Sequence, residues 1–296
     1  CYKLQAGYYL EYDLKTNIIV LNKYWDLLDF YKKEKSIKSE AEILKDIEEL
    51  LIDSCNLRMV SDVPVGIFLS GGYDSSLVTA LLQKHSKTKV NTFTIGFNEK
   101  EYNESEHAKK IAEYLGTNHT EYYCTKNDLI SLMQEFPYIY DEPFGDNSAL
   151  PTIIVSKLAK EKVTVALSAD GGDEVFCGYS KYFALNKIDK LSNNSFKSFL
   201  LKFSANFMNE NSIEFLNKLL PKQLRRTNIK DKFNKFKRTI NAKNTQEMFI
   251  NASSLVISED IDKLLLTNND KEYFQTNFNS FSKLENNSIL EQMMLT

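Results

Sequence analysis

The sequence predicts an α/β fold: a twisted parallel sheet flanked by helices, followed by a mostly helical C-terminal part. The continuous apolar run at residues 65–70 is typical of a strand that is buried on both faces, and two further strands are predicted at 90–97 and 163–168. Stretches with the length of helices separate these strands. Strands that alternate with helices imply a parallel sheet joined by right-handed crossovers.

The composition is that of an ordinary globular chain. Its 296 residues are 43% hydrophobic and 26% charged, with a formal net charge of −3, so a nucleic-acid surface is not expected. The four cysteines (Cys1, Cys55, Cys124, Cys177) show neither CxxC spacing nor a zinc pattern, and are interpreted as reduced thiols of a cytoplasmic protein. No apolar run reaches the roughly 20 residues of a membrane span, and no signal peptide is apparent. A membrane partner is therefore not expected.

Three segments are expected along the chain. Residues 1–40 hold two alternating runs, GYYLEYDL and NIIVLNKYW, separated by Lys15-Thr16-Asn17, which is the pattern of a β-hairpin. Residues 41–183 form the α/β part, which opens with a helix at 41–59 whose apolar residues have helical spacing. Residues 184–296 form the helical part, whose Lys- and Asn-rich stretches, such as NSFKSFLLKFSANFMNENS, are interpreted as compositional bias.

Helices connect the strands of the central segment. One helix is predicted directly after the first strand and another after the second strand, where Gly116 stands at the usual stop position. A third is predicted before the last strand. The expected helices span 74–84, 104–115 and 148–160.

The loop after the first strand, SGGYDSS, has the residues of a phosphate cradle. It lies at the carboxyl edge of the sheet, where open α/β sheets bind their ligands. Gly71 and Gly72 let backbone N–H groups close around an anion, and the following helix adds its N-terminal dipole. Ser70 and Ser75 can donate hydrogen bonds, and Asp74 fits if a divalent cation bridges it to phosphate oxygens. The alternative is a tight turn in which Asp74 only caps the helix.

A second loop repeats this arrangement. The run VTVALS is followed by ADGGDE, which sets Asp170, Asp173 and Glu174 beside two glycines. Carboxylates this close repel one another unless they are solvated or hold a metal ion. A solvated acidic turn is the alternative for this loop alone. Two such loops after two inner strands of one sheet favour a shared site, in which Asp74 and Asp173 hold Mg²⁺ from opposite sides.

These motifs resemble those of a known family. SGGYDSS, which lacks the lysine of a Walker motif, resembles the PP-loop of the N-type ATP pyrophosphatases. DVPVGIFLSGGYDSS and LSADGGDEVFCGYSKY together resemble the synthetase domain of the glutamine-dependent asparagine synthetases, as do TFTIGFNEKEYNESEHAKKIAEYLGTNHTE and DEPFGDNSALPTIIVSKLAK. The resemblance is specific over about residues 60–183, and it implies a fold like that of the adenine nucleotide alpha hydrolases.

The resemblance implies an ATP site built from both loops. The adenine is expected near the ends of the first two strands, at Leu69 and Ile95. The β- and γ-phosphates, which leave as pyrophosphate, are expected on the first loop, at Ser70, Gly71, Gly72, Asp74 and Ser75. The nucleotide and the acyl-adenylate are expected to contact the second loop, at Ser168, Ala169, Asp170 and Gly171.

Catalytic and metal-binding roles follow from the same resemblance. Asp170 and Asp173 are expected in catalysis, while Asp74 and Asp173 correspond to carboxylates associated with Mg²⁺. Tyr179 and the 141–151 segment are expected toward the amino-acid side. The implied reaction converts aspartate and ATP into β-aspartyl-AMP and pyrophosphate, and ammonia derived from glutamine then attacks the adenylate. A homodimer is one expectation for the assembly.

Two alternatives stay open. The same chemistry could amidate another carboxylate, such as a sugar acid or a β-lactam precursor, or the chain could bind ATP without catalysis. Four residues depart from the pattern of the family without removing any residue of the phosphate cradle: Asn103, Asn147, Ala169 and Cys177. The three histidines (His85, His107, His119) match no serine-hydrolase pattern and are expected to be surface or packing residues.

The two ends of the chain resemble parts of a longer protein. KLQAGYYLEYDL resembles the link that leaves a glutaminase domain, and Cys1 is not expected to be a glutaminase nucleophile. ENNSILEQMMLT stops where the family continues into a segment with further acidic, arginine and lysine residues. ATP binding is therefore expected of these residues more readily than catalysis.

Overall fold

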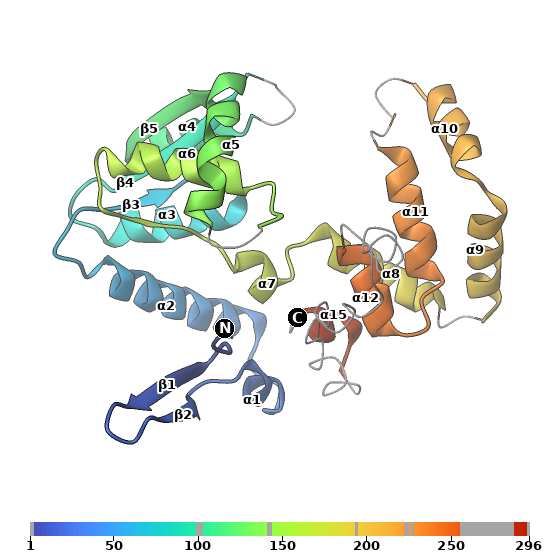
Figure 1. Ribbon diagram of the computed structural model, residues 1–296, viewed down its shortest axis with the longest axis horizontal. Helices are drawn as coiled ribbons and strands as arrows, with labels where there is room; N and C mark the ends of the chain where they lie inside the picture. The colour runs from blue at the N-terminus through green and yellow to red at the C-terminus, as the bar shows by residue number, and fades with distance from the viewer. Residues whose placement is uncertain are drawn as a thin grey trace. The chain divides into compact units, whose positions relative to one another are not determined.

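The computed structural model describes residues 3–98, 103–140, 144–192, 195–221, 225, 228–254 and 287–294 (Figure 1). The chain divides into two compact units. The central unit is Ser36–Gly172, and the other combines Cys1–Lys35 with Asp173–Thr296. These boundaries differ by a few residues from the predicted segment ends at 40 and 183, and the predicted three-segment division stays a prediction.

The central unit contains a four-stranded parallel sheet, which confirms the predicted fold class. Its strands are β3 (Val65–Phe68), β4 (Asn91–Phe97), β5 (Asn118–Cys124) and β6 (Val165–Leu167). Their order is β5-β4-β3-β6, and all neighbouring pairs are parallel. The sheet therefore grows from β3 through β4 to β5, and the chain then returns to place β6 on the other side of β3.

Two details of the sheet differ from the prediction. Strand β5 was not predicted, because NHTEYYC mixes polar and aromatic residues and forms no continuous apolar run. The run that forms β6 was predicted to be an inner strand, but β6 pairs only with β3 within the described sheet, and Val165 is exposed. An apolar run alone does not distinguish an inner strand from an edge strand.

Helices cover both faces of the sheet. One face packs against α2 (Glu40–Met59), α3 (Tyr73–His85) and α4 (Ser105–Leu115), and the other against α5 (Lys126–Ile139) and α6 (Ala149–Lys160) (Figure 1). The four predicted helices are confirmed to within one residue at each end. Helix α5 was not predicted, although the capping box formed by Thr125 and Asp128 marks its start.

Successive side chains of β4 point to opposite faces of the sheet, so they contact both helical layers. Phe93 is fully buried and packs against Val155 and Ala159 of α6. Gly96 faces α4, where a Cβ atom would lie 2.6 Å from the Ser105 hydroxyl oxygen. The strand is thus covered on both sides, as is typical of a strand inside a parallel sheet.

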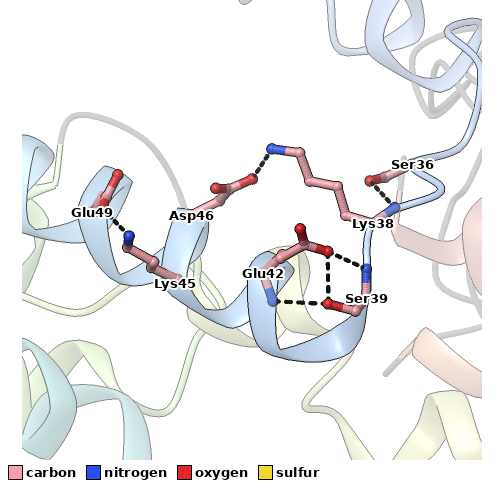
Figure 2. A network of polar contacts seen from close by, with 7 residues as sticks. All are labelled: Ser36, Lys38, Ser39, Glu42, Lys45, Asp46 and Glu49. Atoms are coloured by element: carbon pink, nitrogen blue, oxygen red, sulfur yellow. Dashed lines mark hydrogen bonds and ion pairs between the residues drawn. The ribbon is translucent and has the colours of Figure 1, made fainter.

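Helix α2 begins at a reciprocal capping box (Figure 2). The Ser39 backbone N–H donates to the Glu42 carboxylate at 2.8 Å, and the Glu42 backbone N–H donates to the Ser39 hydroxyl at 3.4 Å. Lys38 pairs with Asp46, and Lys45 lies 3.9 Å from Glu49. These surface ion pairs add little stability, so the serine cap is the stronger local signal for the start of the helix.

We expect Ser39→Ala to lower the free energy of unfolding by about 1 kcal/mol, because it leaves the first turn of α2 without its cap. Urea unfolding followed by circular dichroism measures the change. The matched control is Ser54→Ala on the same helix, and an equal effect of the two substitutions would contradict the capping role.

The other unit combines an N-terminal hairpin with helices. Strands β1 (Tyr8–Asp13) and β2 (Ile18–Lys23) pair antiparallel, which confirms the predicted hairpin. Between 184 and 296, every element in the described residues is helical. The described helices of this unit are α1 (Leu27–Tyr31), α7 (Gly172–Phe176, which starts on the last residue of the central unit), α8 (Ser180–Ser192), α9 (Ser195–Phe207), α10 (Glu210–Leu219), α11 (Ile229–Ile240), α12 (Thr245–Ser253) and α15 (Ile289–Met294).

Helices α8, α12 and α15 form the hydrophobic core of this unit, through Tyr182, Leu185, Met248, Phe249, Ile289 and Met293. None of the described helices is both long enough and apolar enough to cross a membrane. The cysteines that the structure describes are free thiols, and burial raises the pKa of Cys124 to about 11.

Candidate active site

The strand order brings the two predicted loops to one place. Ligands of open α/β sheets bind at the carboxyl edge where the strand order reverses. Here the reversal falls between β3 and β6, which are direct neighbours in the sheet. The loop after β3 contains Ser70–Gly72, and the loop after β6 contains Ser168–Gly171. Both loops therefore leave the sheet at the switch point.

Two serines close the first loop onto the start of α3. The Ser70 and Ser75 hydroxyl oxygens lie 2.9 Å apart, and the Ser70 backbone N–H donates to the Ser75 hydroxyl at 3.2 Å. The Gly72 backbone N–H donates to the Ser70 hydroxyl at 3.2 Å. Ser75 is buried, so these bonds hold the loop in one conformation before any ligand binds.

Gly71 is required by both backbone geometry and space. Its φ of +86° lies in the left-handed region that glycine favours. A Cβ atom on Gly71 would lie 2.8 Å from the Ala108 backbone nitrogen and 3.1 Å from the His107 Cβ atom. The loop backbone thus packs directly on the first turn of α4. The sequence analysis treated His107 only as a surface or packing residue, and no local signal placed it beside this loop.

The first turn of α3 offers backbone donors to an anion. Gly72 is the N-cap residue and provides no side-chain cap, so the N–H groups of the first turn receive no capping bond from the described residues. Such groups, together with the positive end of the helix dipole, bind phosphate in many proteins. The small residues before α3 leave this end of the helix accessible.

The second loop approaches the first closely at Asp74. A Cβ atom on Gly172 would lie only 2.6 Å from Oδ2 and 2.7 Å from Cγ of Asp74. Only a glycine at this position lets the two backbones approach with the Asp74 carboxylate between them. Gly171 has a φ of +91°, which again suits glycine. The two loops predicted to share a site therefore meet at Asp74.

The Asp74 carboxylate is suited to a divalent cation. It is half-buried at the rim of the sheet, and no described residue donates a hydrogen bond to it or forms an ion pair with it. Carboxylate oxygens are the ligands that Mg²⁺ prefers, with phosphate oxygens and water completing the shell. No cluster of three or more metal-ligating side chains occurs within the described ranges, so a metal here would depend on the substrate for further ligands.

The remaining acidic residues have different surroundings. The Ser168 hydroxyl donates to the exposed Asp170 carboxylate at 2.8 Å, within the second loop. Asp173 is the first residue of the other unit, so its approach to Asp74 stays a prediction. Within that unit, Gly178 lies so close to the Asp173 carboxylate that a Cβ atom there would overlap it.

Tyr179, predicted toward the amino-acid side, donates its hydroxyl to Glu174 at 2.6 Å. This hydrogen bond and partial burial raise the pKa of Tyr179, so the phenol stays protonated. Cys177 adopts a φ of +58°, which explains why a glycine would suit this position. Its side chain packs against the core of the helical unit, and burial raises its pKa.

The two residues predicted near adenine occupy opposite faces of the sheet. Leu69 is 1% exposed and packs against Ala108 and Ala112 of α4. Ile95 is half-buried beneath α5 and α6. The Leu69 side chain therefore belongs to the core, and any contact of this residue with adenine would come from its backbone. Part of the predicted amino-acid side, 141–143, lies outside the described residues.

We expect Gly172→Ala to weaken magnesium-dependent ATP binding by about tenfold, because the added methyl group would displace the Asp74 carboxylate. Isothermal titration with and without Mg²⁺ measures the effect. Gly145→Ala is the matched control, since a Cβ atom at Gly145 meets nothing within 4 Å. Wild-type affinity in Gly172→Ala would show that the contact with Asp74 is irrelevant to binding.

A parallel sheet with a lysine-free Gly/Ser loop and a helix N-terminus at its switch point fits the α/β class of proteins that use ATP. The sequence profile of the asparagine synthase family matches residues 46–295, which is most of the chain. The chain belongs to the asparagine synthase family.

Three relatives illustrate the breadth of the match. A Methanocaldococcus jannaschii protein described as a glutamine-hydrolysing asparagine synthetase is 42% identical over 189 residues, 64% of this chain and 36% of the relative. Asparagine synthetase (glutamine-hydrolysing) 1 of Bacillus subtilis is 37% identical over 143 residues, 48% of this chain and 22% of the relative. Amidase chry2 of Gibberella zeae is 26% identical over 198 residues, 62% of this chain and 29% of the relative. The chain thus spans about a third or less of the length of each.

Proposed function

We propose that the chain is the synthetase part of a glutamine-dependent asparagine synthetase. In this reaction, the aspartate side-chain carboxylate attacks the α-phosphorus of ATP, and β-aspartyl-AMP forms as pyrophosphate leaves. Ammonia released from glutamine then displaces AMP and gives asparagine. Membership of the family and the names of the relatives support the ligase class of this proposal.

The observation that carries the proposal is the meeting of the two loops at Asp74 and Gly172. A carboxylate is a poor electrophile, and adenylation gives it a good leaving group. Adenylation requires positioning and charge neutralisation rather than a protein nucleophile. The site has residues of this kind: a preformed serine–glycine loop, uncapped N–H groups at α3 and one carboxylate between two backbones.

Each part has a role in the proposed chemistry. The loop from Ser70 to Ser75 and the first turn of α3 would bind the β- and γ-phosphates through N–H and hydroxyl donors. Asp74, with Asp173 as the predicted second carboxylate, would hold Mg²⁺, which neutralises charge on the departing pyrophosphate. Ser168 and Asp170 on the second loop would lie near the reacting α-phosphate. We place the protein in the cytoplasm, where its proposed substrates occur.

A second candidate keeps the adenylation step and changes the acceptor. The relative named an amidase shows that family resemblance extends beyond proteins named asparagine synthetases. The acceptor would then be another carboxylic acid. The phosphate site would be unchanged, because any acceptor in this reaction attacks the same ATP.

Product analysis of the purified chain tests the proposal. In the presence of ATP, Mg²⁺ and ammonium, we expect AMP and pyrophosphate to be released only when aspartate is added. Without Mg²⁺, we expect ATP to bind only weakly. Aspartate is compared with glutamate and a sugar acid as acceptors. Formation of ADP and phosphate would overturn adenylation. Turnover with a sugar acid but not with aspartate would favour the second candidate, and metal-dependent binding without turnover would favour a binding module.

A further inference from the structure

Helix α9 exposes its most apolar side. Phe199, Phe203 and Phe207 follow one another at intervals of four residues, so they form one stripe along the helix. Their ring centroids are 6.0 and 5.2 Å apart, and the three side chains are 54–80% exposed. The opposite side of α9 carries the small buried residue Ala205. The aromatic stripe therefore points away from the core of its own unit.

Helix α10 continues this arrangement. Phe215, Leu216 and Leu219 are 49–66% exposed, while polar residues of α10 contact α11. Glu214 forms an ion pair with Lys230 of α11 at 2.7 Å, and Glu210 accepts from Asn234 of α11 at 2.8 Å. These bonds orient α10 with its apolar side away from α11.

Both helices lie along the same side of α11 (Figure 1). Asn206 of α9 and Asn241, directly after α11, exchange hydrogen bonds at 3.3 and 3.0 Å. We name the exposed apolar residues of these two consecutive helices the aromatic face: Phe199, Phe203, Phe207, Phe215, Leu216 and Leu219. Its exposed apolar residues are clustered rather than scattered, and such patches mark interaction sites.

The segment that carries the aromatic face has a positive net charge. Residues 195–240 contain eleven Lys and Arg against three Asp and Glu, a net charge of +8, although the whole chain carries −3. Lys202 flanks the stripe of α9, and Lys218, which forms an ion pair with Glu214 at 2.9 Å, flanks the apolar side of α10. The segment is therefore strongly basic within an acidic protein. Compositional bias alone does not explain why its exposed apolar residues lie on one side of each helix.

We propose that the aromatic face docks on the surface of an anionic lipid bilayer. Amphipathic helices with aromatic and leucine side chains on one side and lysines at its borders lie in the bilayer interface without crossing it. The anionic headgroups complement the positive charge of the segment. Two copies of the chain facing one another here would instead bring two segments of charge +8 together. This proposal replaces the expectation of no membrane partner, and it is independent of the proposed catalytic function.

Vesicle co-sedimentation of the purified chain tests the proposal. We expect about tenfold stronger binding to vesicles containing phosphatidylglycerol than to pure phosphatidylcholine vesicles, with the difference shrinking as salt is added. Phe199→Ser/Phe203→Ser/Phe207→Ser should lose most of the binding. Lys202→Glu/Lys218→Glu should lose the preference for anionic vesicles. The matched control, Leu44→Ser/Leu50→Ser/Leu57→Ser on α2, alters three exposed apolar residues elsewhere and should bind normally.

A second measurement does not depend on multiple substitutions. Trp25 is the only tryptophan of the chain, so Phe203→Trp in a Trp25→Phe background reports on the aromatic face alone. We expect its fluorescence to shift to the blue when anionic vesicles are added. An unshifted spectrum, equal binding to both kinds of vesicle, or normal binding of the triple Phe variant would overturn the proposal. Two other results would also overturn the proposal, if the triple Phe variant abolished them. One is self-association of the chain, and the other is capture of an acidic protein without vesicle binding.

Discussion

Asp74→Asn is expected to reduce magnesium-dependent ATP binding, and any release of pyrophosphate that accompanies it, by about a hundredfold or more. The substitution keeps the size of the side chain, so the contact with Gly172 and the fold should persist. It removes the negative charge that would hold the metal against the phosphates. Isothermal titration with ATP in the presence of Mg²⁺, and again with a chelator, measures the loss.

The control for this prediction is Asp53→Asn, which neutralises an exposed carboxylate of α2 in the same unit. Its affinity should match that of the unmodified chain with and without metal. If Asp74→Asn retained the full difference between the two conditions, the assignment of Asp74 as the metal ligand would be wrong.

Phe93→Ala should lower the free energy of unfolding by about 3–5 kcal/mol, because it opens a cavity in the middle of the sheet. The Phe93 ring is fully buried against α6, and it lies so close to Gly66 that a Cβ atom there would be 2.5 Å from it. The loss is a large share of the about 5–15 kcal/mol that stabilises a typical domain. The backbone carbonyl of Phe93 accepts from Leu69, directly before the first loop, so ATP binding should weaken as well.

Urea unfolding of the central unit measures this effect through the midpoint of the transition. Tyr114→Ala removes an aromatic side chain that is 90% exposed on α4, and its effect should stay within about 0.5 kcal/mol. Similar midpoints for the two variants would show that Phe93 does not carry the packing between the sheet and α6.

Much of the fold could be predicted because its signals are local. The apolar run of β3, the stop at Gly116 and the alternation of β1 and β2 each lie within a few neighbouring residues. Strand β5 was missed because NHTEYYC mixes polar and aromatic residues, which breaks the apolar run. Helix α5 was not predicted, although Thr125 and Asp128 form a capping box, so the sequence does contain a local signal for the start of this helix.

In the candidate site, too, local features could be predicted from the sequence, whereas contacts between distant residues could not. The two glycine-containing loops were visible in the sequence, since positive φ angles at Gly71 and Gly171 demand a residue without a side chain. The packing of Gly71 on the first turn of α4 was not visible. It depends on a contact between residues more than thirty positions apart, and His107 has no local feature that indicates it.

By itself, the sequence determined that parallel strands end in two small-residue loops with carboxylates, because apolar runs and glycine positions are properties of short stretches. Only the tertiary structure decided that β6 lies beside β3 and that Gly172 therefore touches Asp74. It also decided that the phenylalanines of α9 face outward. Strand order and helix orientation depend on which distant surfaces bury one another, and that choice is spread over the whole chain.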